Sequence, residues 1–550
     1  VVRRQLLQRY EHQPFVSCLA GLYGCQWRRY QRAKPVLYSC RCNFGKLGFW
    51  FPWSVVLLVL AAALFTYIAL LLVLAVCLLS EGQRLYLHWS HKIGILVTLC
   101  FSISATAVLS DLRSKEWTTL LLSFQVTAPF LHVGGVSLMT FLSWPIALHF
   151  FRMNKRVRQV ALLSLFLAVL FALYLVPLGM YSPCIKEEGT LGPAPTLIGH
   201  RGAPMLAPEN TQMSFEKAVG AGGEGLETDV TISYDGVPFL MHDRTLRRTT
   251  NIQQVFPNRT DAPAAMFTWP ELEMLSAGSW FLQRDPFSTV SSLDADERVR
   301  VQNQTVPSLK DLLNLAAQHE RLVIFDLRRP PQGHPYRDSW ITRTLEVIHN
   351  ESSINSSQVV LWLPADQRSL VQELDPELQQ TSGDHASIEE LQEEHIVRLN
   401  LHYSYMSQEQ IRKYASVNIS TNLYVISQPW LYSLAWCAGV HSVTTNAPHK
   451  LKTLQRPLFL MTPDEYSLMW ILTDIVSTAS AGTLCSLTPS SPCMSPLCMA
   501  SPSDPPSLSL LSAELSDVWS ISSISISVHR EAQNSPVTPS LPTISEEPPV

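Results

Sequence analysis

The chain has 550 residues, of which 47% are apolar and 16% are charged, and its formal net charge is −4. Such a small net charge does not indicate nucleic acid or any other strongly charged partner, so no nucleic-acid partner is expected. The length leaves room for more than one structural unit. Long apolar runs in the first third of the chain favour a membrane region followed by a separate domain.

The first 182 residues combine a basic segment with four apolar runs that are long enough to cross a bilayer. Residues 1–50 are basic and aromatic and lack the apolar core of a signal peptide, so we expect them in the cytosol. The four runs fall within residues 51–182, at 53–79, 93–109, 118–142 and 160–180. They predict an α-helical, multi-pass membrane region.

Two features of the sequence predict the topology. Residues 149–158, just before the fourth run, carry basic side chains and no acidic one, which places this loop in the cytosol and the following domain outside. Five N-x-S/T sequons in that domain also favour a lumenal or extracellular location. Their asparagines are Asn258, Asn303, Asn350, Asn355 and Asn418. Four spans would put the basic N-terminus outside as well, so we expect that one span is missing from this sequence.

Residues 195–460 alternate short β-like runs with helical patterns. This alternation predicts an α/β fold, a (β/α)8 TIM barrel, with its active groups at the carboxyl ends of the strands. The β-like runs lie at 197–199, 225–233, 237–241, 322–327, 359–363, 397–401, 422–426 and 442–445. Residues 244–307 do not alternate, and we interpret them as an insertion.

The remaining features concern cysteines and the C-terminal end. Only Cys184 and Cys437 lie in the outer region; they form a disulfide, or Cys437 is a buried core thiol. Residues 466–487 begin like a span but contain Asp474, so they are a weak or truncated final span. Residues 488–550 are rich in serine and proline and are predicted to be disordered.

Reactive residue types gather at the ends of the first β-like runs. His200 and Arg201 follow the first run, and His242 follows the third. Glu227 and Asp229 alternate along the second, so both carboxylates face one side of a strand. Two histidines, an arginine and a same-face acidic pair are what metal-assisted cleavage of a phosphodiester requires. Each motif alone is compatible with a structural role, but their order and spacing together favour catalysis.

This segment resembles the glycerophosphodiester phosphodiesterase family, whose barrels carry the motifs HRG, PENT, E-x-D, DG and HD in this order. The matching residues here are His200-Arg201-Gly202, Pro208-Glu209-Asn210-Thr211, Glu227-Thr228-Asp229, Asp235-Gly236 and His242-Asp243. The later sequence TNAP at 445–448 resembles the end of the family's final strand. The apolar runs and the sequences SPCI and WCAGV resemble the family's multi-pass vertebrate subgroup, which has six spans with the barrel outside between the fifth and sixth.

The resemblance implies a role for each matching residue. His200 and His242 correspond to the general acid and base, and Arg201 to the phosphate clamp. Glu209 and Arg328 are further expected contacts of the phosphate or substrate. All five lie in or directly after a β-like run or in the PENT loop.

The resemblance also implies one divalent cation, Ca²⁺ or Mg²⁺, for which carboxylate oxygens are suitable ligands. Glu227 and Asp229 correspond to two of its ligands. The third ligand in many family members is a glutamate two residues before a lysine, whereas this chain has Asp326 and Arg328. We therefore expect Asp326 as the third ligand, with a geometry that differs from that of those members.

Together these features predict a multi-pass enzyme of the plasma membrane, with its catalytic domain extracellular or lumenal. It would hydrolyse glycerophosphodiesters or, like a phospholipase C, the glycosylphosphatidylinositol (GPI) anchors of surface proteins. One alternative is a hydrolase restricted to soluble glycerophosphoinositol or glycerophosphocholine. Another is a catalytically weak receptor or adaptor, which the intact histidines disfavour and the Asp326/Arg328 pair leaves open.

Overall fold

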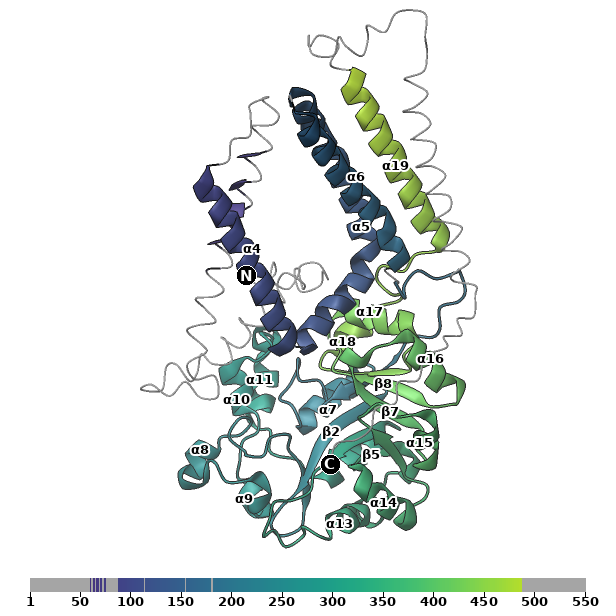
Figure 1. Ribbon diagram of the computed structural model, residues 1–550. Helices are drawn as coiled ribbons and strands as arrows, with labels where there is room; N and C mark the ends of the chain where they lie inside the picture. Colours follow the sequence, from purple (N-terminus) through teal and green to yellow (C-terminus); the bar gives the residue numbers. More distant parts are fainter. Residues whose placement is uncertain are drawn as a thin grey trace, which may run out of the picture. The chain divides into compact units, whose positions relative to one another are not determined.

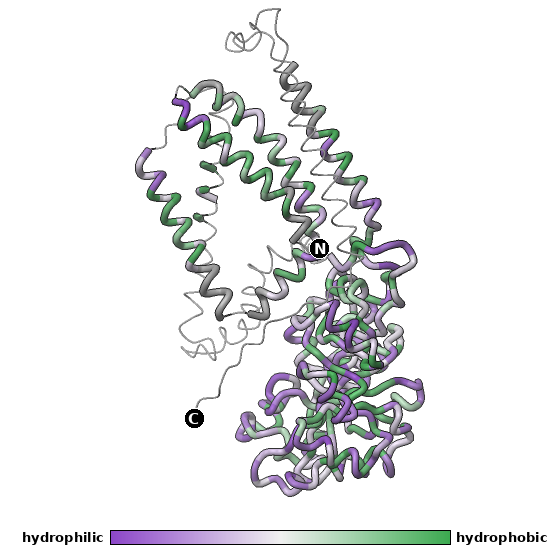
Figure 2. Tube along the Cα trace, turned by 45° about the vertical axis from the view of Figure 1, so that its right-hand side comes forward, coloured by the Kyte–Doolittle hydropathy of each residue, from purple (hydrophilic) through white to green (hydrophobic). Residues whose placement is uncertain are grey.

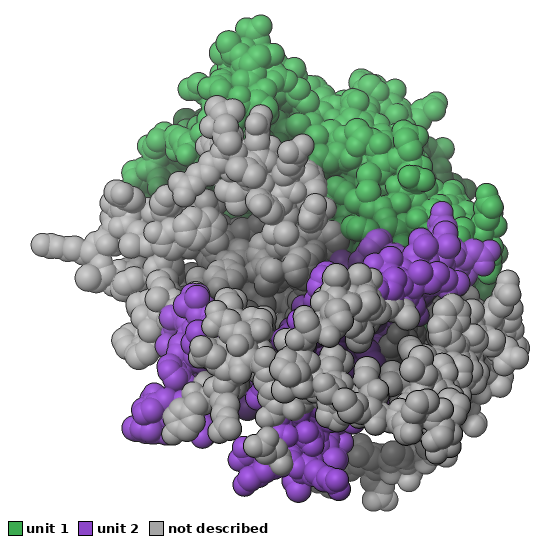
Figure 3. All heavy atoms as spheres, turned by 90° about the horizontal axis from the view of Figure 1, so that it is seen from above, with its two compact units in different colours: residues 1–58, 105–126, 183–462 green, residues 59–104, 127–182, 463–550 purple. Residues whose placement is uncertain are grey.

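The computed structural model describes residues 88–112, 114–153, 155–179 and 182–486, with scattered positions between 60 and 75. Two compact units divide these residues, and Figure 3 marks them in different colours. The first unit takes its described residues from 105–126 and 183–462, and the second from 59–104, 127–182 and 463–486. The expected basic segment 1–50, most of the first expected span and the tail 488–550 lie outside the described residues.

Long helices cover three of the expected spans and the weak final one. Their bounds are α4 (Trp89–Leu112), α5 (Ser114–Arg152), α6 (Arg156–Gly179) and α19 (Pro463–Ser486). Hydrophobic residues predominate along α4 and α6 in Figure 2. By length and composition, one described helix is able to cross a bilayer, at Arg156–Leu173. The bent pair Leu121–Phe130 and His132–Ala147, at 57°, would be a second if it forms one broken span. A multi-pass arrangement therefore remains a prediction.

Eight parallel strands close into a barrel, because β1 pairs with β2 on one side and with β9 on the other (Figure 1). The strands are β1 (Thr196–His200), β2 (Gly225–Ile232), β4 (Leu322–Leu327), β5 (Val359–Trp362), β6 (Gln379–Ser382), β7 (Arg398–His402), β8 (Ser420–Tyr424) and β9 (Ser442–Thr445). They follow one another around the barrel in chain order. The predicted TIM barrel is confirmed.

Two strands differ from the prediction. The run at 237–241 is not a barrel strand: β3 (Pro238–Leu240) folds back antiparallel on β2, with Val230 opposite Leu240. Gly236, at φ +93°, closes this hairpin in a conformation that glycine adopts without strain. The remaining barrel strand is β6, whose sequence QQTS lacks the apolar residues by which strands are recognised.

Helices on the outside of the barrel bury an apolar face against the sheet. They are α7 (Gln212–Gly220), α12 (Leu309–Gln318), α13 (Trp340–Glu346), α14 (Arg368–Leu374), α15 (Ile388–Glu393), α16 (Gln408–Ser416), α17 (Pro429–Ala438) and α18 (Pro448–Leu451). In α12, Ser308 and Asp311 form a capping box that starts the helix. Leu309, Leu312 and Leu313 then repeat at helical spacing and are buried in the main core cluster.

Residues 244–307 contain only short helices. These are α8 (Ile252–Val255), α9 (Trp269–Glu273), α10 (Ser279–Arg284) and α11 (Ala295–Gln302), with 3-10 turns between them. The segment has an apolar cluster of its own around Phe267 and Leu272. Its start nevertheless follows β3 directly, which brings residues of the insertion beside the end of β2.

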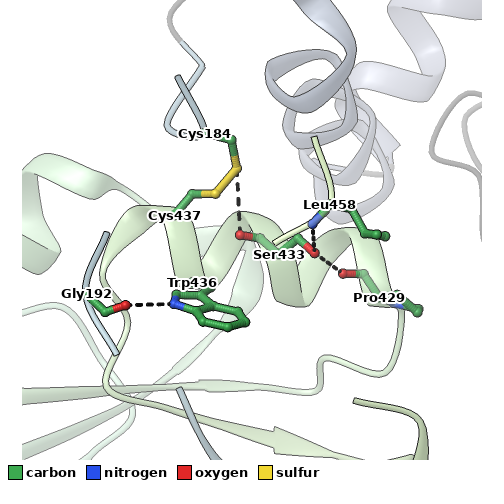
Figure 4. The surroundings of a disulfide bond; sticks show 7 residues. All are labelled: Cys184, Gly192, Pro429, Ser433, Trp436, Cys437 and Leu458. Atoms are coloured by element: carbon green, nitrogen blue, oxygen red, sulfur yellow. Dashed lines mark hydrogen bonds between the residues drawn. A yellow bond between two sulfur atoms is a disulfide. The ribbon is translucent and has the colours of Figure 1, made fainter. Parts of the chain in front are cut away.

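A disulfide joins Cys184, just before the barrel, to Cys437 in α17 (Figure 4). The Cα atoms are 5.0 Å apart, and the bond spans 253 residues of chain. Beside it, the indole nitrogen of Trp436 donates a hydrogen bond of 2.9 Å to the carbonyl of Gly192. Of the two interpretations of Cys437, the structure has the disulfide. It fastens the segment that enters the barrel to the barrel's last helices.

Candidate active site

The reactive side chains share one layer at the carboxyl ends of the strands. In the register, His200 lies opposite Glu227, and Asp229 lies opposite Asp326. Side chains paired in this way point to the same side of the sheet. One layer lower, Ile198 and Ile324 form an apolar cluster with Val360 that fills the barrel interior. The polar layer is therefore the mouth of the barrel, where TIM-barrel enzymes carry their active groups.

His200 is held in its neutral form. Its Nδ1 is 2.6 Å from Oδ1 of Asn446, which follows β9, so Nδ1–H donates and Nε2 is left unprotonated. Nε2 lies 3.9 Å from Oε2 of Glu227. Burial, followed by the charge of Arg201, lowers the pKa of His200 to about 4. Near neutral pH, Nε2 of His200 is therefore unprotonated and can accept a proton.

Arg201 is fixed among carboxylates. Its guanidinium lies 2.9 Å from Glu209 and 3.0 Å from Asp229. Its backbone N–H donates to both the carbonyl and the carboxylate of Glu227. The residue has φ +55°, an uncommon conformation outside glycine and one that recurs at functional sites. At Gly202 an added Cβ would lie 2.5 Å from Ser214, so only glycine fits there.

The PENT loop connects α7 to the carboxylate layer. Thr211 is the N-cap of α7 and accepts a hydrogen bond from the backbone of Ser214. Asn210 donates to Asp229 at 3.4 Å and accepts from Thr228 at 2.8 Å. Glu209 points to the arginines, and its pKa is about 2: burial raises it, but Arg248 and Arg201 together outweigh burial.

His242 follows β3 and is oriented by its neighbour. Its Nδ1 lies 2.7 Å from Oδ1 of Asp243. Burial raises the pKa of Asp243, but hydrogen bonds from His242 and Arg248 outweigh this effect and hold the pKa well below its usual range. The carboxylate therefore stays ionised and fixes the imidazole with Nδ1 as a donor, leaving Nε2 for other partners.

Arg248 was not among the residues predicted from sequence, yet it connects the two halves of the site. It donates to Asp243 from Nε at 2.7 Å and from Nη2 at 3.0 Å. It also donates to Glu209 from Nη1 at 2.8 Å and from Nη2 at 2.6 Å. A continuous chain of contacts thus runs from His242 through Arg248 to Arg201. The only hint in the sequence was an arginine five residues after the HD motif.

Burial and neighbouring charges act strongly on the acidic pair, Glu227 and Asp229. Burial, followed by the charge of Asp229, raises the pKa of Glu227 to about 8. Arg328 donates to Asp229 at 2.7 Å and to Asp326 at 2.9 Å, and its Nη1 also donates to the carbonyl of His242. Burial raises the pKa of Asp326 even so.

The donors suit a divalent cation in their chemistry and in their charge. Within the described part of the chain, no group of three His, Cys, Asp or Glu side chains has the spacing of a metal site. Arg328 contacts two of the three expected ligands, Asp229 and Asp326. The cluster nevertheless combines three guanidinium groups with five carboxylates. These are Arg201, Arg248 and Arg328, with Glu209, Glu227, Asp229, Asp243 and Asp326. An anionic phosphodiester would gain from additional positive charge here.

The chain is similar to known proteins. The model of the glycerophosphoryl diester phosphodiesterase family matches residues 200–450. Glycerophosphodiester phosphodiesterase domain-containing protein 5 of Homo sapiens is 48% identical over 510 residues, covering 87% of this chain and 84% of the relative. Glycerophosphoinositol inositolphosphodiesterase GDPD2 of Mus musculus is 42% identical, covering 84% and 91%. The structure of an Oleispira antarctica phosphodiesterase with the product sn-glycerol-3-phosphate matches at 23% identity and TM-score 0.39, covering 47% and 96%. The chain therefore belongs to the glycerophosphoryl diester phosphodiesterase family and is a glycerophosphodiester phosphodiesterase.

Proposed function

We propose that this phosphodiesterase acts at the outer face of a membrane, where it cleaves glycerophosphodiesters or, in the manner of a phospholipase C, GPI anchors of neighbouring proteins. The proposed catalysis is supported mainly by one observation: His200 and His242 are oriented in the same way. His200 and His242 each use Nδ1 to contact a fixed side-chain oxygen, and both adjoin the same arginine–carboxylate cluster. In each ring, Nε2 remains for transferring a proton.

The two rings divide the proton transfers between them. His200, neutral near physiological pH, accepts the proton of the attacking hydroxyl as its oxygen bonds to phosphorus. His242, steadied by Asp243, gives a proton to the alcohol oxygen as the bond from that oxygen to phosphorus breaks. Attack by a substrate hydroxyl next to the ester gives a cyclic phosphate, and attack by water gives the open monoester. Arg201 stabilises the charge that builds up on the phosphate oxygens.

Glu227, Asp229 and Asp326 are the proposed ligands of one Ca²⁺ or Mg²⁺ ion, which would neutralise phosphate charge when bound. Arg328 contacts two of these carboxylates, so the arginine has to share them with the ion. Arg328 and Glu209 are then the residues that adjust the charge of the phosphate site. In the receptor or adaptor alternative, Arg328 would stay in place and the ion would not bind.

The outward orientation is supported by three observations on the barrel and the helices. The barrel contains a disulfide, which forms and persists in oxidising compartments. All five sequon asparagines are exposed on the surface of the barrel: Asn258, Asn303, Asn350, Asn355 and Asn418. Among the residues that the structure describes, one helix is a candidate membrane span, or two if the bent pair counts.

The test compares the wild type with His200→Ala in cells and with purified protein. We expect wild-type cells to release GPI-anchored proteins into the medium, and purified wild type to hydrolyse glycerophosphoinositol and glycerophosphocholine. The variant should reach the surface and do neither. Release without dependence on His200 would refute the anchor assignment. Hydrolysis of soluble substrates without any release would favour the alternative of a hydrolase restricted to them.

A further inference from the structure

The mouth of the barrel has a second half that takes no part in the proposed proton transfers. It is formed by the carboxyl ends of β5, β7 and β8, where the last residues are Trp362, His402 and Tyr424. These three side chains, here called the mouth rings, are half-buried. In the register, Trp362 lies opposite Asp326 and Tyr424 lies opposite Thr444. The mouth rings thus continue the layer that holds the carboxylates.

Ring contacts show that these side chains point into the barrel. Strands β5 and β8 are separated in the sheet by β6 and β7, yet the rings of Trp362 and Tyr424 have centroids only 5.3 Å apart. Two side chains so placed meet only inside the mouth. His402 meets Tyr424 edge-on at 5.8 Å. Trp362, which contacts Tyr424, lies opposite Asp326 in the register, so the mouth rings adjoin the carboxylate half.

A glycine makes room for the largest ring. A Cβ added at Gly383, just after β6, would lie 2.7 Å from the six-membered ring of Trp362 and 2.9 Å from its nitrogen. The φ of Gly383 lies outside the left-handed region, so its backbone does not demand glycine. The absence of a side chain at this position therefore serves the placement of Trp362.

The polar atoms of these rings indicate what they contact. Phenylalanine is the most frequent aromatic residue in the chain, with 21 against 16 tyrosines and 14 tryptophans, but none is among the mouth rings. Within the residues that the structure describes, the Trp362 indole nitrogen and the Tyr424 hydroxyl have no hydrogen-bond partner. Flat apolar faces with hydrogen-bonding edges match a ligand with C–H faces and a rim of hydroxyl groups.

We propose that the mouth rings form a subsite for a cyclic polyol, a sugar or cyclitol ring joined to the phosphate of the substrate. The phosphate lies in the charged half of the mouth, and the ring lies against Trp362 and Tyr424. This inference rests on the proposed function and names the substrate class that the same site prefers. The competing interpretation is an aromatic cage for a quaternary ammonium group, which would not need hydrogen-bonding atoms at the edges of the rings. The test below distinguishes the two.

The experiment measures kcat/KM of the purified full-length protein on glycerophosphoinositol, glycerophosphocholine and glycerophosphoethanolamine. Tyr424→Phe and Trp362→Phe keep a ring and remove its polar atom, and Gly383→Ala displaces Trp362 without changing any ring. We expect each variant to lower the ratio of the inositol to the ethanolamine substrate by about five- to tenfold, and the choline to ethanolamine ratio to stay within about twofold. Trp269→Phe, in the insertion, is the matched control and should leave all ratios unchanged.

The outcomes separate failure of this subsite from failure of the proposed function. A selective loss on the choline substrate, or an equal loss on all three, would overturn the polyol subsite while hydrolysis still depends on His200. Hydrolysis that persists undiminished in His200→Ala would instead overturn the proposed function itself. The thermal unfolding midpoint of Tyr424→Phe is measured as well. A value close to that of the wild type shows that the variant has lost substrate recognition and not its fold.

Discussion

Arg248 offers a direct test of the network at the mouth, through the variant Arg248→Gln. In the wild type, this side chain makes two hydrogen bonds to Glu209 and two to Asp243. Glutamine removes the charge and shortens the reach, so both carboxylates lose their shared partner. Glu209 is the more deeply buried of the two, with 10% of its side chain exposed, and its ionisation should therefore be the most affected.

The magnitude follows from the pKa of Glu209. A fall from 4.5 to about 2 corresponds to ~3 kcal/mol of stability. Arg201 supplies part of it, so we expect Arg248→Gln to cost about 2 kcal/mol near neutral pH. Because the folded-state pKa is lowered, this stabilisation is complete above about pH 4.5 and is lost as the pH falls toward 2. The difference between wild type and variant should therefore shrink over the same range.

The measurement is thermal unfolding of the purified full-length protein, followed by tryptophan fluorescence at pH 7 and pH 3. We expect the variant to unfold about 4–8 °C below the wild type at pH 7, and by a smaller difference at pH 3, where part of the stabilisation has been lost. Arg247→Gln is the matched control: its partner Asp261 has a side chain 80% exposed, and such pairs contribute little. A difference that stays constant with pH, or equals that of the control, would refute the proposed link between Arg248 and Glu209.

Four further outcomes are expected. Asp243→Asn should lower kcat at least about 100-fold, with a smaller effect on KM, because it removes the charge that orients His242. Steady-state kinetics measures both constants, and an unchanged kcat would show that this orientation is unimportant. Cys184→Ser should lower the stability of the barrel by about 2–5 kcal/mol, measured by denaturant unfolding without reductant. A strong chelator should abolish hydrolysis, and added Ca²⁺ or Mg²⁺ should restore it; activity that survives chelation would argue against the ion. Glycosidase treatment of protein from cells should reduce its apparent mass, because the sequon asparagines are exposed; an unchanged mass would argue against the outward orientation.

The strands that were predicted correctly differ in a simple way from those that were not. LVIFDL in β4 and VVLW in β5 are apolar because barrel strands are covered on both faces. The sequence QQTS of β6 forms a mostly buried strand with polar side chains, of which Gln380 and Thr381 donate hydrogen bonds to backbone carbonyls. Conversely, β3 has the composition of a barrel strand, and only its pairing with β2 reveals a hairpin. Pairing partners cannot be read from the local pattern.

The same limit separates the site residues that were predicted from those that were not. His200, Glu227 and Asp229 stand in short motifs with a chemistry that is evident from residue type and spacing. Arg248 contacts a carboxylate 39 residues away, and nothing near it in the sequence indicates that contact. Trp362 and Tyr424 are also far apart in the chain, and only closure of the barrel brings their rings together. The residues that do the chemistry can thus be recognised from short motifs, whereas the contacts that position them depend on residues far away in the sequence.

Closure of the barrel also explains how one mouth can combine catalysis with selectivity. The charged half comes from β1, β2 and β4 with the turn after β3, where arginines and carboxylates are joined by ion pairs. The ring half comes from β5, β7 and β8, where polar atoms of Trp362 and Tyr424 have no partner among the described residues. Changes in the second half can therefore alter which alcohol is bound without disturbing the charges that act on the phosphate. The register of Asp326 opposite Trp362 marks the boundary between the two halves. Substitution at Trp362 should consequently change relative rates among substrates, whereas substitution at Asp326 should change all of them together.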